Sequence, residues 1–145
     1  KNQDFVFQRD GVLENLGTTN IAFSPDLIAA NRLVFMPIQN FQVSLLSKFV
    51  GEQYMGNIDA ESSKLDSYFV NDLNASYEIV TKKVFKSIRI DALVNNIFNL
   101  EYESNGYFYT YDDDFSNPGT VTTIEGTGFY PQAGINLLAG LTLLF

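Results

Sequence analysis

The most regular pattern of hydrophobic and polar positions lies between Phe129 and Phe145, at the C-terminal end of the chain. Its odd positions are all apolar: Ile135, Leu137, Ala139, Leu141, Leu143 and Phe145. Its even positions are mixed, with Asn136, Gly140 and Thr142 interrupted by Leu138 and Leu144. Successive side chains of a β-strand point to opposite faces of the sheet. The pattern therefore predicts a strand with one apolar face and one mixed face.

Four more segments alternate or run apolar in a strand-like way. They cover about Asn20–Met36, Phe41–Tyr54, Leu65–Val80 and Ser87–Asn99, and the last of these has an open continuation toward Tyr111. Leu27–Val34 is the best helical candidate, but Pro25 and the flanking alternation favour a strand. No segment combines a helical period with caps at both ends. We therefore predict an all-β chain of about five long antiparallel strands.

The connections between these segments alternate in length. Met36–Asn40 and Thr81–Lys86 are short, whereas Gly51–Lys64 and Tyr102–Gly128 are long and polar. Transmembrane β-barrels have this asymmetry, with short periplasmic turns and longer outer loops. The segments also exceed the ~5–6 residues of an average globular strand, and are long enough to cross the apolar core of a bilayer. Together, these features favour transmembrane β-barrel strands.

Alternation by itself is equally compatible with a soluble β-sandwich for binding or adhesion, in which each apolar face packs on a second sheet. Solubility without detergent would favour that alternative. Five strands are also too few to close a barrel, and an open edge in hydrocarbon would leave backbone groups without partners. A small structural barrel of about eight strands would need three more strands than the pattern predicts. Two interpretations of a barrel therefore stay open: either the pattern misses strands of this chain, or most of the barrel lies outside it.

Composition narrows the functional classes. Among the 145 residues, 17 are acidic and nine basic, a net charge of −8, which argues against binding nucleic acid. The chain has no Cys and no His, so a disulfide, a Cys/His metal site and a Ser–His triad are excluded. No glycine-rich phosphate loop is present, and no apolar run is long enough for a transmembrane helix. We identify no catalytic or metal-ligating residues, and expect neither an enzyme nor a cofactor.

Several segments together resemble TonB-dependent outer-membrane receptors of the siderophore or haem type. Leu65–Tyr77 (LDSYFVNDLNASY), Val94–Tyr102 (VNNIFNLEY) and Phe129–Phe145 (FYPQAGINLLAGLTLLF) are similar to three patterns of the family, in the family's order. Asn20–Asp26 (NIAFSPD) and Ser44–Gly51 (SLLSKFVG) also fit. The resemblance covers about residues 20–145.

The resemblance implies a plugged barrel of about 22 strands. Residues 20–145 would supply roughly the last five of them, and residues 1–19 the end of an extracellular loop. The family's plug and its TonB-contacting segment have no counterpart here, and we expect the chain to begin inside a longer precursor. The implied function is active uptake of a scarce ligand, an iron–siderophore or haem. The implied location is the outer membrane of a Gram-negative bacterium. Its partners there would be membrane lipid, the remaining barrel strands, the barrel-assembly machinery and, through the missing plug, a TonB-type energy-coupling complex.

Ten residues are candidates for functional roles. The resemblance implies that Leu137, Ala139, Leu141, Leu143 and Phe145 form the signal read by the assembly machinery, although a plain lipid-facing stripe has the same composition. Arg89 and Asp91 are two positions apart, so they share a strand face and are expected to pair, either in a lumen or on a solvated face. Tyr107, Tyr109 and Tyr111 suit stacking on a planar or glycan-like ligand. The alternative for these tyrosines is a strand extension with an interfacial girdle.

Two polar clusters have simpler interpretations. Asp112, Asp113 and Asp114 are carboxylates that suit a hard cation, but three adjacent acids are more commonly solvated. Asn95, Asn96 and Asn99 are expected to hold local backbone structure where a strand ends, because Asn side chains imitate turn hydrogen bonds.

Overall fold

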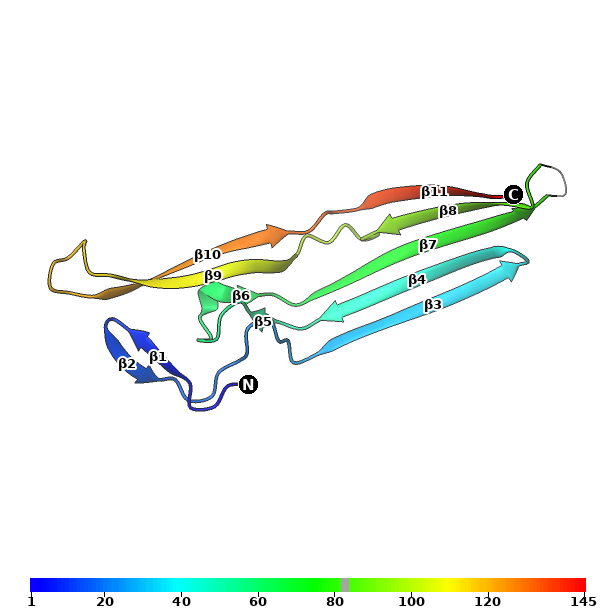
Figure 1. Cartoon of the computed structure of the whole chain (residues 1–145). Helices are drawn as coiled ribbons and strands as arrows, with labels where there is room; N and C mark the ends of the chain where they lie inside the picture. The colour runs from blue at the N-terminus through cyan, green and yellow to red at the C-terminus, as the bar shows by residue number, and fades with distance from the viewer. Residues whose placement is uncertain (82–83) are drawn as a thin grey trace. The chain divides into compact units, whose positions relative to one another are not determined.

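The computed structural model describes residues 1–81 and 84–145, and this part of the chain is all-β (Figure 1). Its only helical element is the single 3₁₀ turn η1 (Glu61–Ser63). The chain divides into two compact units that we treat separately. The hairpin unit comprises Lys1–Leu27, Gly51–Tyr68 and Tyr102–Gln132, and the sheet unit comprises Ile28–Val50, Phe69–Glu101 and Ala133–Phe145. No helix among the described residues has the length and hydropathy of a membrane span.

The sheet unit is built on one five-stranded sheet with the order β11–β8–β7–β4–β3 (Figure 1). Its strands are β3 (Ile28–Ile38), β4 (Phe41–Val50), β7 (Tyr68–Val80), β8 (Ser87–Asn95) and β11 (Asn136–Leu144). The pairs β3–β4, β7–β8 and β11–β8 are antiparallel. All five strands are as long as or longer than the ~5–6 residues usual in globular domains.

Short connections join β3 to β4 and β7 to β8. Gln39 and Asn40 connect β3 to β4, and Asn40 adopts φ 64°, a left-handed conformation that Asn tolerates better than most residues. Beyond β7, the Thr81 N–H donates to the Lys86 carbonyl (3.0 Å), so the two ends of the connection to β8 are held together. Lys82 and Lys83, part of the connection predicted at Thr81–Lys86, lie outside the described residues.

The hairpin unit contains two hairpins and a small buried cluster. β1 (Val6–Arg9) pairs with β2 (Val12–Asn15), and β9 (Glu103–Asp113) pairs with β10 (Thr122–Pro131). Two-residue strands, β5 (Gln53–Tyr54) and β6 (Lys64–Leu65), flank η1. Met55, Leu65 and Tyr68 are the buried apolar residues of this unit, and the Tyr68 ring lies 4.4 Å from that of Tyr102.

The structure confirms the all-β antiparallel class and the preference for a strand over a helix at Leu27–Val34. Several predicted boundaries were wrong. Phe129–Phe145 is not one strand, since Phe129–Pro131 is the end of β10 and β11 begins only at Asn136. The strand predicted from Asn20 begins only at Ile28, because the N–H groups of Asn20 and Ala22 donate to the side chains of Asp59 and Asn57 instead of to a ladder.

The predicted loop Tyr102–Gly128 is instead mostly the β9–β10 hairpin. Asn105-Gly106 is a pair typical of tight turns, but here it lies inside β9, where a Cβ on residue 106 would stand 2.4 Å from the Gly128 carbonyl oxygen. Glycine is therefore required at this position by close strand approach rather than by chain reversal. The first hairpin, β1–β2, was not predicted at all.

Candidate functional site

One face of the sheet unit, hereafter the apolar face, is composed of matched apolar residues from adjacent strands. Residues paired across a ladder share a face. Across β11, β8 and β7 the rows are Leu137/Val94/Leu73, Ala139/Ala92/Ala75, Leu141/Ile90/Tyr77 and Leu143/Ile88/Ile79. The Phe41 ring meets that of Tyr77 edge-on at 6.1 Å, which places the odd positions of β4 on the same face. The apolar face therefore continues through Val43, Leu45 and Phe49 to their β3 partners Phe35, Leu33 and Ala29.

The apolar face carries no charged side chain on the described strands, and its polar side chains gather in one place. Asn31 is paired with Ser47, whose hydroxyl donates to the Asn71 Oδ1 at 2.6 Å. Ser47 and Asn71 are buried, and the Asn71 Nδ2 has no hydrogen-bond partner among the described residues. An unpartnered buried donor is costly. The Ser47 bond therefore satisfies only half of the Asn71 amide.

The apolar face is nevertheless exposed. Leu137, Leu141 and Leu33 retain 68%, 65% and 65% of their accessible surface. Among the described apolar residues of the sheet unit only Val50 is buried, so the sheet forms a single layer without a core of its own. Monomeric soluble proteins rarely expose an apolar surface of this continuity.

Aromatic residues mark both ends of the apolar face. Phe49 and Phe69 lie toward one end of β4 and β7, and Phe41 and Tyr77 lie eight positions away on the same strands. Eight residues of strand span ~27 Å. Near the second end, the Phe85 ring meets the Phe145 ring at 4.9 Å. Between the two groups the face is mostly aliphatic, except for Phe35 and the polar cluster of Asn31, Ser47 and Asn71.

The opposite face, hereafter the polar face, is mixed but carries the charged side chains of the described strands. There Glu78, Arg89 and Thr142 form one row, and Ser76, Asp91 and Gly140 form the next. Arg89 donates to the Asp91 Oδ1 from Nε (3.0 Å) and Nη2 (2.9 Å). Apolar side chains also lie on this face, so charge distinguishes the two faces more sharply than hydropathy does. They include Val34, Leu46, Val80, Leu93, Leu138 and Leu144.

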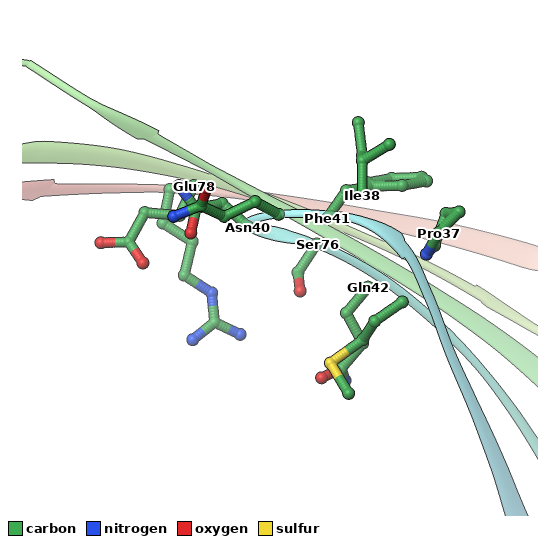
Figure 2. Close-up of a pocket in the computed structure, with 10 residues that line it drawn as sticks. Pro37, Ile38, Asn40, Phe41, Gln42, Ser76 and Glu78 are labelled. Atoms are coloured by element: carbon green, nitrogen blue, oxygen red, sulfur yellow. The ribbon is translucent and has the colours of Figure 1, made fainter.

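An open hollow of about 550 Å³ lies on the polar side, beside the β3–β4 turn. Residues Met36–Gln42 and the side chains of Ser76, Glu78 and Arg89 line it. Figure 2 shows the side chains of Ser76 and Gln42 on one side of the strands and that of Ile38 on the other. The separation of polar and apolar side chains onto opposite faces thus extends to the β3–β4 turn.

Asparagines fasten β11 to the end of β8. Asn96 (φ 50°) is buried, its Oδ1 accepts from the Leu100 N–H (2.9 Å), and its Nδ2 donates to the carbonyls of Leu100 (2.8 Å) and Ala133 (3.3 Å). The Asn99 Oδ1 accepts from the Ile135 N–H at 2.8 Å, one residue before β11 begins. Asn95 Nδ2 donates to the Asn136 Oδ1. These three residues organise local backbone and register.

The hairpin unit carries a second feature, a row of tyrosines on one side of β9. Tyr107, Tyr109 and Tyr111 have successive ring centroids 6.3 Å apart and interplanar angles of 16°. Their partners on β10 are Gly128, Gly126 and Ile124. A Cβ on Gly126 would lie 2.3 Å from the Tyr109 Cζ, and one on Gly128 would lie 2.4 Å from the Tyr107 Cζ, so both rings rest against glycine backbone. We call these three residues the tyrosine ladder.

The other side of the same hairpin is packed against β1–β2 and η1. Asp10 and Thr123 exchange two hydrogen bonds, Gln8 donates to Asp112, and Arg9 pairs with Glu125 (3.6 Å). Ser62 also donates to Glu125 at 2.9 Å. The packed side is thus polar and cross-linked, whereas the ladder side is open.

The Asp112–Asp114 run does not converge on one point. Asp112 accepts from Gln8 and Thr123, and Asp113 accepts from the N–H groups of Phe115 and Ser116. Hydrogen bonds from Ser116 and Phe115 hold the pKa of Asp113 below its usual value. Asp113 therefore stays ionised at the end of the hairpin.

The structure places the ten predicted site residues in three groups. Leu137, Ala139, Leu141 and Leu143 lie on the apolar face, with Phe145 directly beyond β11; Arg89 and Asp91 pair on the polar face; and Tyr107, Tyr109 and Tyr111 form the ladder. Sequence reasoning missed the Ser47–Asn71 bond and the glycines opposite the tyrosines. The alternation Gly126-Thr-Gly128 was the available signal for the latter.

Comparison with protein-family models, with curated proteins and with solved structures gave no match.

Proposed function

We propose that this chain forms part of the wall of an outer-membrane β-barrel, of the type found in TonB-dependent receptors for iron–siderophores or haem. The observation that carries the proposal is the uncharged, exposed apolar face of a single-layer sheet. In this assignment lipid hydrocarbon covers that face, and the polar face with Arg89 and Asp91 looks into the lumen.

The dimensions of the apolar face support a lipid contact. Barrels present an apolar band ~25 Å tall between girdles of aromatic residues. The aromatic groups of the sheet unit stand ~27 Å apart along β4 and β7, a distance that shortens somewhat when strands tilt. A sandwich core has no need of aromatic residues at its two rims.

The edges of the sheet support a larger barrel. β3 and β11 each have one paired side among the described residues. Further strands of the parent protein would continue the ladder on both sides, because hydrocarbon does not tolerate open sheet edges. The receptor type itself rests on the three resembling segments in family order.

Spin labels test the lipid contact directly, because the chain contains no native cysteine. Single cysteines at positions 137–144, labelled in the protein reconstituted in bilayers, should report oxygen accessibility at odd positions and accessibility to a polar nickel reagent at even ones. The soluble sandwich would be favoured if oxygen accessibility did not alternate between successive positions. It would also be favoured if spin labels at positions 137 and 141 were poorly accessible to both oxygen and the nickel reagent.

The uptake role needs a separate experiment. Deleting the gene in the cell that produces the protein should abolish growth on one iron chelate or on haem as sole iron source. Restoring the gene should restore growth. Unimpaired growth on every such source would refute the receptor assignment while leaving the barrel assignment intact.

A further inference from the structure

The tyrosine ladder is a row of half-exposed aromatic rings, two of which lie against glycine backbone. Tyr107 and Tyr109 lie across Gly128 and Gly126, so backbone occupies the inner side of each ring. Tyr107, Tyr109 and Tyr111 still expose 48%, 51% and 53% of their surface. Tyr130 extends the row, with its ring 6.0 Å from that of Tyr107. The face of an aromatic ring carries negative electrostatic potential.

The unit that carries the ladder is strongly acidic. The hairpin unit holds thirteen of the 17 acidic residues but only three of the nine basic ones. Two of these three cations are already paired, Arg9 with Glu14 and Glu125, and Lys64 with Glu52. On the ladder side of β9, the alternation that places the tyrosines together continues to the carboxylate of Asp113. Such a field attracts cations and repels phosphates and carboxylates.

The spacing of the rings matches an extended peptide. Alternate residues of a β-strand project on one side at intervals of ~6.6 Å. The ring centroids repeat every 6.3 Å. Lys or Arg side chains at every second position of a bound strand would therefore each meet one ring, in the cation–π geometry available to exposed aromatic residues.

We propose that the tyrosine ladder binds an extended cationic peptide segment, with basic side chains at alternate positions over Tyr107, Tyr109 and Tyr111. The proposal does not depend on the membrane role argued above. A neutral sugar would use the ring faces but not the surrounding charge, and a lipid headgroup phosphate would be repelled by it.

Peptide binding to the whole chain, in detergent or bilayer, tests this proposal. Because the chain has no tryptophan, the emission anisotropy of a peptide carrying one Trp reports the complex without background. The probes are Trp followed by four Lys-Ser repeats, Trp followed by Lys₄Ser₄, and Trp followed by four Glu-Ser repeats. The alternating basic peptide should bind more tightly than the block peptide of equal composition, and the acidic peptide should not bind. Added salt should weaken the complex.

Three variants separate the ring face from other contributions. Tyr109→Leu should weaken binding about two- to fivefold, the value of one exposed cation–π contact, and Tyr109→Phe should retain it. Gly126→Ala should weaken binding similarly, because the new Cβ would lift the Tyr109 ring from the strand. Tyr77→Leu, in the sheet unit, is the matched control and should have no effect.

Several results would overturn the proposal. They are equal affinity for the alternating and block peptides, no loss in Tyr109→Leu, and tighter binding of maltoheptaose or of anionic vesicles than of the alternating peptide. Loss of binding in Tyr109→Phe would also contradict it, because that variant keeps the ring and removes only the hydroxyl. Near-ultraviolet circular dichroism of each variant establishes that the hairpin is folded.

Discussion

Asp10 and Thr123 are 113 positions apart in sequence and hold each other by two hydrogen bonds of 2.7 Å, one from each backbone N–H to the other side chain. The Thr123 hydroxyl also donates to the Asp112 Oδ1 at 2.7 Å. These bonds link the β1–β2 turn to β10, so the two hairpins of this unit are coupled.

Thr123→Val should weaken that coupling. The substitution keeps the β-branched shape but removes the acceptor for the Asp10 N–H and the donor to Asp112. We expect a loss of about 1–2 kcal/mol, the value of one or two partly exposed hydrogen bonds, with faster amide exchange at Asp10. Thr122→Val, one position earlier, is the control and should change the exchange rate little. Equal exchange in both variants would show that the turn is held by backbone pairing alone.

Gly126→Ala should destabilise the β9–β10 hairpin. Its Cβ would stand 2.3 Å from the Tyr109 Cζ, and relief requires the ring to move. Overpacking of this kind costs about 1–3 kcal/mol, measured by urea unfolding. Gly140→Ala is the matched control, because its Cβ would meet only the Asp91 Cβ at 3.9 Å. The prediction fails if the two alanine variants are equally stable.

Asn96 should contribute through both its backbone and its side chain. Its φ of 50° suits Asn or Gly, and its amide group makes three hydrogen bonds. Asn96→Ala should therefore cost more than Asn96→Gly, by the ~1–2 kcal/mol that a Cβ costs in the left-handed region. In both variants, the backbone amides of the paired residues Asn95 and Asn136 should exchange their hydrogens faster. Equal stability of the two would assign the whole effect to the side chain.

The turn after β9 should depend on pH through Asp113. Hydrogen bonds from Ser116 and Phe115 lower the pKa of its carboxyl, so the ionised form is favoured in the folded chain. The stabilisation is present above the ordinary value of 3.8 and is lost as pH falls through the lowered pKa. Chemical shifts of the Phe115 amide should report this titration. Ser116→Ala should move the Asp113 pKa upward, and Asp113→Asn should abolish the transition.

Period-two alternation was enough to predict which residues share a face of the sheet unit, but not where each of its strands begins. Leu137, Leu141 and Leu143 lie on one face, as the odd positions of the sequence required, and the short connection predicted at Met36–Asn40 is a turn at Gln39 and Asn40. The tertiary partners of Asn20 and Ala22 were not predictable, because they come from residues about 35 to 39 positions away. Only the folded hairpin shows why Asn105-Gly106 continues a strand instead of ending it.

The candidate site also contains features that the sequence predicts and features that only the folded structure shows. The pairing of Arg89 with Asp91 follows from a spacing of two on one strand, and sequence alone can predict it. The glycines under the tyrosine ladder depend on the β9–β10 register, which a long connection does not specify. The Ser47–Asn71 bond likewise needs the lateral order of β4 and β7.

The hydrogen bond from the Ile135 N–H to the Asn99 side chain holds the residue that precedes β11, and so helps to fix the register of that strand. Because side chains alternate with every residue, a slip of one position between β11 and β8 would exchange the environments of Leu141 and Thr142 and of every neighbour along the strand. The Asn99 amide oxygen is therefore one determinant of which β11 residues face each side of the sheet. An insertion of one residue between Asn99 and Ile135 that displaced this bond would turn every β11 side chain to the opposite face, although the composition of the strand would not change.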